Sequence, residues 1–127
     1  MFPPLGMQIP EHLLLVWAAA YYRALGWAVT PVRGKRAYLH DWPRLDLELS
    51  DLQRELAQPG RGIGLVLGAR SGDLVDVDLD CGEALELAPL LLPPTALIHG
   101  RRSRPRSHWW YRSPQARSTA FRGPAPL

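Results

Sequence analysis

The sequence predicts a mixed α/β domain of the α+β kind, with a mixed or antiparallel sheet at its centre. The predicted elements follow the order helix, strand, helix, strand, strand, short helix, strand, strand, so strands succeed one another directly in two places. The chain has 127 residues, of which 46% are apolar and 21% charged. That length and composition suffice for the core of one domain and exclude a disordered chain.

The first part of the chain predicts a helix, a strand and a basic loop. Leu, Trp and Tyr recur at spacings of three and four over residues 11–25, and Gly26 stands where a helix ends. Residues 27–32 predict a short strand, in which Pro31 marks the end or an edge position. Residues 33–36 then form a compact basic loop.

The middle of the chain predicts a second helix and two strands. Ser50 and Gln53 have the spacing of a capping box and open a helix that reaches about residue 57. We expect a glycine-flanked, buried strand at residues 62–68. After a turn, a second strand follows at residues 74–80.

The last part predicts one short helix and two further strands. The helix covers residues 83–92 and is disturbed at Pro89. Strands are expected at residues 95–99 and 107–112, joined by a basic loop at residues 100–106. We therefore expect three parts along the chain, which are an irregular arm at residues 1–10, a domain at residues 11–112 and an irregular tail at residues 113–127.

Charge is divided unevenly along the chain. Residues 1–86 carry 8 basic and all 12 acidic side chains, whereas residues 87–127 carry 7 arginines and neither Asp nor Glu. A segment with only positive charge indicates a polyanion partner. Alternatively, a GC-rich coding sequence, which favours arginine, would produce the same bias.

Several classes of protein are excluded by simple features. The longest nearly unbroken apolar run, residues 13–22, is too short for a transmembrane helix. Glu11 and His12 precede this run and residues 1–10 hold no Lys or Arg, which argues against a signal peptide. The single cysteine, Cys81, excludes an internal disulfide framework and a CxxC-type zinc site. We expect a soluble, cytoplasmic protein.

Three aspartates alternate with apolar residues along the strand predicted at residues 74–80. Side chains two residues apart on a strand share a face, so Asp76, Asp78 and Asp80 line one side at steps of about 6.6 Å. Like charges in a row destabilise a strand, and aspartate is rare in strands. A bound Mg²⁺ or Mn²⁺ would offset the repulsion, because both cations prefer carboxylate oxygens.

The three aspartates also admit a simpler interpretation, which is a half-exposed strand with solvated carboxylates. Two other kinds of site, a calcium-binding loop and a phosphatase centre, are excluded by the spacing and the types of the residues around the aspartates. A calcium loop of the EF-hand type that begins at Asp76 would need glycine at Cys81 and glutamate at Leu87. A phosphatase of the haloacid-dehalogenase type would use an Asp-x-Asp pair, yet no lysine follows Lys35.

Arginines and aromatic residues dominate residues 101–112. The strand period of two divides the predicted strand into one face with Arg106, His108, Trp110 and Arg112 and another with Ser107, Trp109 and Tyr111. Cations, a titratable donor and a stacking ring on one face suit a nucleoside triphosphate or a single-stranded template. An aromatic core strand with arginines that reach to solvent is the alternative. The other histidines are interpreted as structural, and these are His12, His40 and His99.

The order of these motifs resembles the primase–polymerase (Prim-Pol) domain of the archaeo-eukaryotic primase superfamily, found in bifunctional DNA primase/polymerase proteins of phages and plasmids. The resemblance covers about residues 11–112. It is carried by a helix-to-strand opening at residues 24–32, the glycine-flanked strand at residues 62–68, the acidic motif at residues 74–83 and the histidine motif at residues 105–109.

The resemblance implies a divided α/β fold around an RRM-like sheet, which polymerises nucleotides on a DNA template. Asp76 and Asp78, with Asp80 as an alternate, would hold Mg²⁺ or Mn²⁺. His108 would complete the catalytic set by contacting the triphosphate. The wider set that would bind nucleotide or nucleic acid is Lys35, Arg36, Arg104, Arg106, Ser107, His108 and Trp110. Implied partners are template DNA, nucleoside triphosphates and a helicase domain or protein.

One feature departs from the family's pattern. The family also uses a third acidic residue beyond the histidine motif, whereas no Asp or Glu follows Glu86 in this chain. We therefore expect an N-terminal fragment, incomplete at its C-terminus, which binds nucleotide or metal and catalyses poorly. The alternative function is a non-catalytic nucleic-acid-binding module that uses residues 101–112, and a third is a remnant without function.

Overall fold

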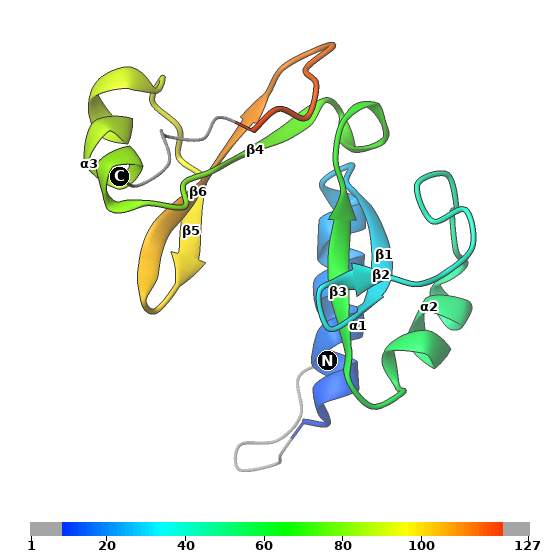
Figure 1. Cartoon of the computed structure of the whole chain (residues 1–127). Coiled ribbons are helices and arrows are strands. Elements are labelled where there is room, and N and C mark those ends of the chain that lie inside the picture. Colours follow the sequence, from blue (N-terminus) through cyan, green and yellow to red (C-terminus); the bar gives the residue numbers. More distant parts are fainter. Residues whose placement is uncertain (1–8, 121–127) are drawn as a thin grey trace. The chain divides into compact units, whose positions relative to one another are not determined.

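The computed structural model describes residues 9–120 and contains helices and strands in both halves of the chain (Figure 1). The chain forms two compact units, Met1–Gly72 and Asp73–Leu127, and each is described by itself. Each unit contains one three-stranded antiparallel sheet. The predicted α+β class is thus confirmed. The strands form two separate three-stranded sheets, one in each unit, instead of the single central sheet that the sequence predicted.

The first unit is an antiparallel sheet covered by two helices. In chain order its elements are α1 (Glu11–Ala24), β1 (Ala28–Arg33), β2 (Arg36–Ala37), α2 (Leu49–Leu56), β3 (Arg61–Val66) and the 3₁₀ helix η1 (Ala69–Ser71). β1 lies between β2 and β3. The core consists of Val16 and Ala19 from α1 and Leu52 and Leu56 from α2. Val29 and Ile63 pack against this core, so the helices cover the sheet face that carries these two residues.

The helix and first strand of this unit agree with the sequence prediction, whereas the basic loop predicted at residues 33–36 is wrong, because Arg33 ends β1 and Arg36 begins β2. Gly26 has a φ of 87° just after α1, a conformation that glycine adopts without strain. Pro31 lies inside β1, opposite Ile63 of β3. β2 pairs only with Val32 and Arg33, so β1 has a neighbour on one side at Pro31. Proline is tolerated at such an edge position, as the sequence suggested.

The capping box predicted for α2 is wrong. The helix begins at Leu49 with Glu48 as its N-cap, and no side chain caps it, so Ser50 lies inside the helix. The position of α2 is set instead by Leu52 and Leu56. These residues are one helical turn apart and almost completely buried, which places them on the same face towards the core.

The strand predicted as buried at residues 62–68 is β3, and it is mostly half-buried. Only Val66 is fully buried, and the other five residues of the strand are half-buried. The end of β3 is tied to β1 through Ser71 of η1. The Ser71 hydroxyl donates to the carbonyl oxygen of Val66 and accepts the backbone N–H of Ala28 at 2.8 Å.

The second unit is a sheet with one helix. Its elements are β4 (Leu74–Asp78), α3 (Gly82–Leu91), β5 (Ile98–Arg101) and β6 (Arg104–Arg112), with β6 between β4 and β5. Leu79, Ala88 and Trp109 form its buried core. As the sequence predicted, α3 continues through Pro89 and ends before the prolines at positions 93 and 94.

The basic loop predicted at residues 100–106 is wrong, because these residues form a β-hairpin. β5 extends to Arg101, a two-residue turn follows at Arg102 and Ser103, and β6 begins at Arg104. The two strands approach very closely at Gly100, where an added Cβ would collide with the backbone carbonyl oxygen of Arg104. Glycine therefore permits a pairing that a side chain would block.

The described residues nearest the two ends of the chain are irregular. Residues 9–10 and 113–120 lie outside every helix and strand. The rest of the predicted arm and tail, residues 1–8 and 121–127, falls outside the described residues. Across residues 9–120, no helix combines the length and the hydrophobicity that a bilayer crossing requires.

Candidate functional site

The pairing of β4, β6 and β5 places the acidic and histidine motifs side by side. Asp78 lies directly opposite His108 of β6, and His108 in turn lies opposite His99 of β5. Asp76 lies opposite Trp110. Directly opposed residues of antiparallel strands share a face, so these five side chains occupy one face of the sheet. We call this set the polar face.

The strand alternation that the sequence predicted for β6 is confirmed at residues 107–110. Ser107 and Trp109 are buried on the core side, whereas His108 and Trp110 are half-buried on the polar face. Ser107 was also predicted to bind nucleotide. Its buried hydroxyl faces away from the polar face, so the structure does not bring it together with His108.

Asp76 holds the imidazole of His108. The Nδ1 atom of His108 lies 2.9 Å from Oδ2 and 3.1 Å from Oδ1 of Asp76. A carboxylate accepts hydrogen bonds, so Nδ1 carries the proton in this contact. The second ring nitrogen, Nε2, is then free of the aspartate and available to a ligand.

Asp78 lies close to the same imidazole and is more open to solvent. Its Oδ1 atom is 3.8 Å from Nδ1 of His108, and 53% of its side chain is exposed, against 18% for Asp76. Partial burial raises the pKa of the Asp78 carboxyl, and the negative charges of Asp80 and Asp76 raise it further, against the opposing effect of His108. A cation bound at this carboxylate would relieve the repulsion.

Asp80 does not extend the row of aspartates along the strand. β4 ends at Asp78, and Asp80 is exposed in the segment that leads to α3. Within residues 9–120, no three His, Cys, Asp or Glu side chains gather closely enough to hold a metal ion. The donor chemistry of Asp76 and Asp78 still suits Mg²⁺, which is commonly bound by one or two carboxylates together with water and substrate phosphates.

His99 is a member of the polar face that the sequence interpretation missed. Its ring stacks on the ring of His108, with centroids 5.1 Å apart, and on Trp110 at 5.4 Å. The sequence interpretation of His99 is that of a structural residue; in the structure it is exposed, and its stacking places it beside the ring of His108. No local signal could have revealed this stack, because it depends on the register between β5 and β6.

The arginines of the hairpin lie in different surroundings. Arg104 donates a hydrogen bond to the backbone carbonyl of Asp80 and so links the hairpin to the acidic motif. The guanidinium of Arg106 lies over the ring of Trp109, with Cζ 5.5 Å from the ring centroid. Both arginines are exposed and can reach a ligand.

Lys35 and Arg36 belong to the first unit. Lys35 lies in the turn between β1 and β2, and Arg36 begins β2. Both side chains are exposed. Since each unit is described by itself, their relation to the polar face stays a prediction.

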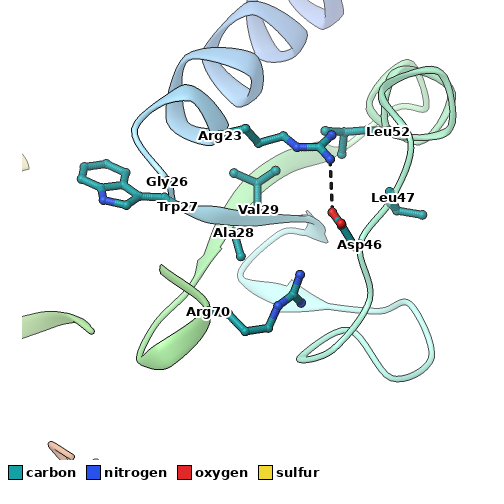
Figure 2. Close-up of a pocket in the computed structure, with 9 residues that line it drawn as sticks. All are labelled: Arg23, Gly26, Trp27, Ala28, Val29, Asp46, Leu47, Leu52 and Arg70. Atoms are coloured by element: carbon teal, nitrogen blue, oxygen red, sulfur yellow. Dashed lines mark hydrogen bonds and ion pairs between the residues drawn. The ribbon is translucent and has the colours of Figure 1, made fainter. Parts of the chain in front are cut away.

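A cavity of about 240 Å³ lies in the first unit, and no predicted site residue lines it (Figure 2). Figure 2 shows Arg23 and Asp46 facing each other at its wall, joined by an ion pair of 3.2 Å. Arg70, on the other side, donates hydrogen bonds to the backbone carbonyls of Pro43 and Leu45. These arginines already bond protein oxygens, so we do not assign the predicted chemistry to this cavity.

The family model described as bifunctional DNA primase/polymerase, N-terminal (Prim-Pol), matches residues 18–125. The matched range includes the acidic motif, the hairpin and every predicted site residue. No curated protein matches the chain, and neither does any solved structure.

Proposed function

The chain belongs to the family of bifunctional DNA primase/polymerase N-terminal (Prim-Pol) domains, and from that premise we propose that it performs template-directed nucleotidyl transfer with a divalent cation. Membership implies a function of the primase or polymerase type. The observation that carries the specific proposal is the contact of two aspartates of β4 with His108 of β6 on one face of the sheet.

Asp76 and Asp78 are the proposed ligands of Mg²⁺ or Mn²⁺. A carboxylate has about four lone-pair sites, so Asp76 can accept the hydrogen bond from Nδ1 of His108 and still offer oxygen to a cation. When bound, the cation would neutralise triphosphate charge and promote attack by a primer hydroxyl. Asp80, exposed and two residues beyond Asp78, is the alternate ligand.

His108 is the proposed contact to the triphosphate. Asp76 fixes its Nδ1, so Nε2 can donate to a phosphate oxygen when the ring carries a proton on both nitrogens. Its stacking on His99 restricts the rotation of the ring. A donor whose orientation is set in advance binds its ligand with a smaller loss of conformational entropy.

The hairpin supplies the proposed contacts to nucleic acid. Arg104 and Arg106 are exposed cations that can form forked hydrogen bonds to phosphate. Trp110 offers part of its ring to a base on the polar face. Ser107 was also predicted to bind nucleotide or nucleic acid. Its side chain is buried, so we propose that it helps to position β6 instead. Lys35 and Arg36 of the first unit are further proposed contacts to template or triphosphate.

The proposal is tested by titrating Mn²⁺ and dGTP into the chain and into the double variant D76N/D78N. We expect the wild type to bind both ligands and to extend a primed DNA template, and we expect the double variant to lose both properties. The variant Asp51→Asn is the matched control, because it neutralises an exposed carboxylate on α2. Equal binding by the double variant and the control would contradict the proposal.

A second candidate function is a nucleic-acid-binding module without catalysis. It is favoured by the composition of the described residues after Glu86, which include six arginines and no carboxylate side chain. Such a module would bind single-stranded DNA in a salt-sensitive manner and would ignore the aspartates. DNA binding by a wild-type chain that takes up no Mn²⁺ would favour this function over nucleotidyl transfer.

A further inference from the structure

A row of positive charges crosses one end of the first sheet. The strand register places Arg33 of β1 directly opposite Arg36 of β2 on one side and Arg61 of β3 on the other. Opposed residues in antiparallel strands share a face and have Cβ atoms about 5 Å apart. We call these three residues the arginine row.

The arginine row has no counter-charge within the described part of the first unit. No carboxylate oxygen there lies within 4.0 Å of its nitrogen atoms, and the ion pairs of this unit are made by Arg23, Arg44 and Arg54. Glu55 of α2 accepts a hydrogen bond from the hydroxyl of Tyr38 and forms no ion pair with an arginine of the row. Like charges directly opposite one another destabilise a sheet, so an anion bound here would stabilise it.

Tyr38 fixes two arginines of the row. The Cζ atoms of Arg33 and Arg61 lie 4.8 Å and 4.6 Å from the centroid of its ring. The Nε of Arg61 also donates to the Tyr38 hydroxyl at 3.0 Å, and that hydroxyl lies 3.3 Å from Oε1 of Glu55. Stacking orders a guanidinium group without using its N–H donors. Within residues 9–120, the guanidinium groups of Arg33 and Arg36 donate to no protein oxygen, so their N–H donors are available to a ligand.

We propose that the arginine row binds successive phosphate groups of a single strand of nucleic acid. Three directly opposed arginines, with neighbouring Cβ atoms about 5 Å apart, form a line of cationic side chains, which suits a chain of phosphates. The turn after Arg33 leads into the strand β2 and not into a helix N-terminus of the kind that receives a triphosphate. Lys35, in that turn, adds a neighbouring positive charge. The choice of nucleic acid as the phosphate source rests on the proposed function.

The test measures the binding of a fluorescent oligothymidylate to the whole chain by anisotropy, in EDTA and over a series of salt concentrations. Each lost phosphate contact lowers the salt slope by about 0.7, which is about fivefold in affinity near 0.1 M salt. We expect this loss from Arg33→Gln and again from Arg36→Gln. The matched control is Arg44→Gln, an exposed arginine of the same unit that is paired with Asp41. Equal losses in the control and the row variants would overturn the proposal.

Two further measurements identify the phosphate source and guard against misfolding. Inorganic triphosphate, added at constant ionic strength, should leave the oligonucleotide bound, and its displacement of the strand would overturn the assignment to nucleic acid. The variant Arg61→Lys keeps the charge and loses the planar fork, so we expect weaker binding with an unchanged salt slope. A loss of slope in this variant would contradict the proposed geometry.

Failure of this proposal can be distinguished from failure of the proposed function. The double variant D76N/D78N should bind the oligonucleotide as the wild type does in EDTA. If the wild type extends a primer and the row variants bind DNA normally, the arginine row has no such role and the proposed function stands. If the wild type transfers no nucleotide and the row variants lose DNA binding, the arginine row binds nucleic acid as proposed and the proposed function is contradicted.

Discussion

Nδ1 of His108 lies 2.9 Å from Oδ2 of Asp76, and this contact joins the central strand of the second sheet to its acidic neighbour. Through this contact Asp76 orients the imidazole, and its carboxylate oxygens are also proposed ligands of the cation. Asp78, two residues further along the same face, has no comparably short bond to the ring. The two aspartates therefore differ in what their removal should do to the fold.

Asp76→Asn should destabilise the second unit. The change replaces a charged acceptor of the His108 hydrogen bond by an amide, and a bond to a charged group contributes about 1.5–3 kcal/mol to stability. We expect a loss near the lower end of this range, because the pair is only partly buried. Chemical denaturation measures the free energy of unfolding. ¹⁵N NMR of the imidazole should show a larger share of the tautomer with its proton on Nε2, and an unchanged spectrum would contradict the orienting role.

Asp78→Asn should have the opposite effect on stability. The pKa of this carboxyl is raised in the folded chain, so folding favours its protonated form. The folded state therefore loses stability as the pH rises from the ordinary aspartate range through the raised pKa. The amide removes this loss, and we expect a Tm above that of the wild type at pH 7.

The same comparison at low pH is the control for Asp78. Below about pH 3.5, both the wild-type carboxyl and the asparagine are mostly neutral in the folded and unfolded states. The two melting temperatures should then converge. A difference in Tm that persists unchanged at low pH would show that the effect of the substitution is not electrostatic.

The faces of β4 and β6 could be predicted from the sequence, whereas the contacts between them could not. A period of two is a local property of any strand, so the separation of Asp76 from Val77 follows from the chain itself. The Asp76–His108 contact and the stacking of His99 depend on register across three strands. Register is set by packing between distant segments and leaves no mark on a short stretch of sequence.

The hairpin escaped prediction for a different reason. Its two-residue turn consists of Arg102 and Ser103, which lack the Asn-Gly or Gly-rich signal of common hairpin turns. A run of arginines therefore resembles a solvated loop. The informative residue is Gly100, whose role becomes visible only when the opposing backbone is in place.

Gly100→Ala should disrupt the hairpin. The new Cβ would collide with the carbonyl oxygen of Arg104 and would lie 2.6 Å from the hydroxyl oxygen of Ser107, so the strands must separate. Overpacking of this kind costs about 1–3 kcal/mol. Thermal denaturation should show this loss, and DNA binding by the hairpin arginines should weaken with it.

The control for Gly100 is Gly82→Ala at the start of α3. No atom lies within 4 Å of the position that its Cβ would take, and alanine favours a helix by up to about 1 kcal/mol over glycine. We expect no loss of stability from this change. Equal destabilisation by the two substitutions would mean that the close approach at Gly100 does not limit the hairpin.

Tyr38 should make the first unit sensitive to alkali. Burial is the main cause that raises the pKa of its hydroxyl above the ordinary value of 10.0, and Glu55 raises it further, against the opposing effect of Arg61. The folded state favours the neutral phenol. The stabilising contribution of Tyr38 is therefore complete below pH 10 and is lost as the pH rises through the raised pKa.

We expect the Tm of the wild type to fall above about pH 10 more steeply than that of Tyr38→Phe. The phenylalanine keeps the ring between Arg33 and Arg61 and removes only the ionisable hydroxyl. Absorbance in the near ultraviolet should show one tyrosine that ionises later than the others, and its presence in the Tyr38→Phe spectrum would assign the late titration to another ring.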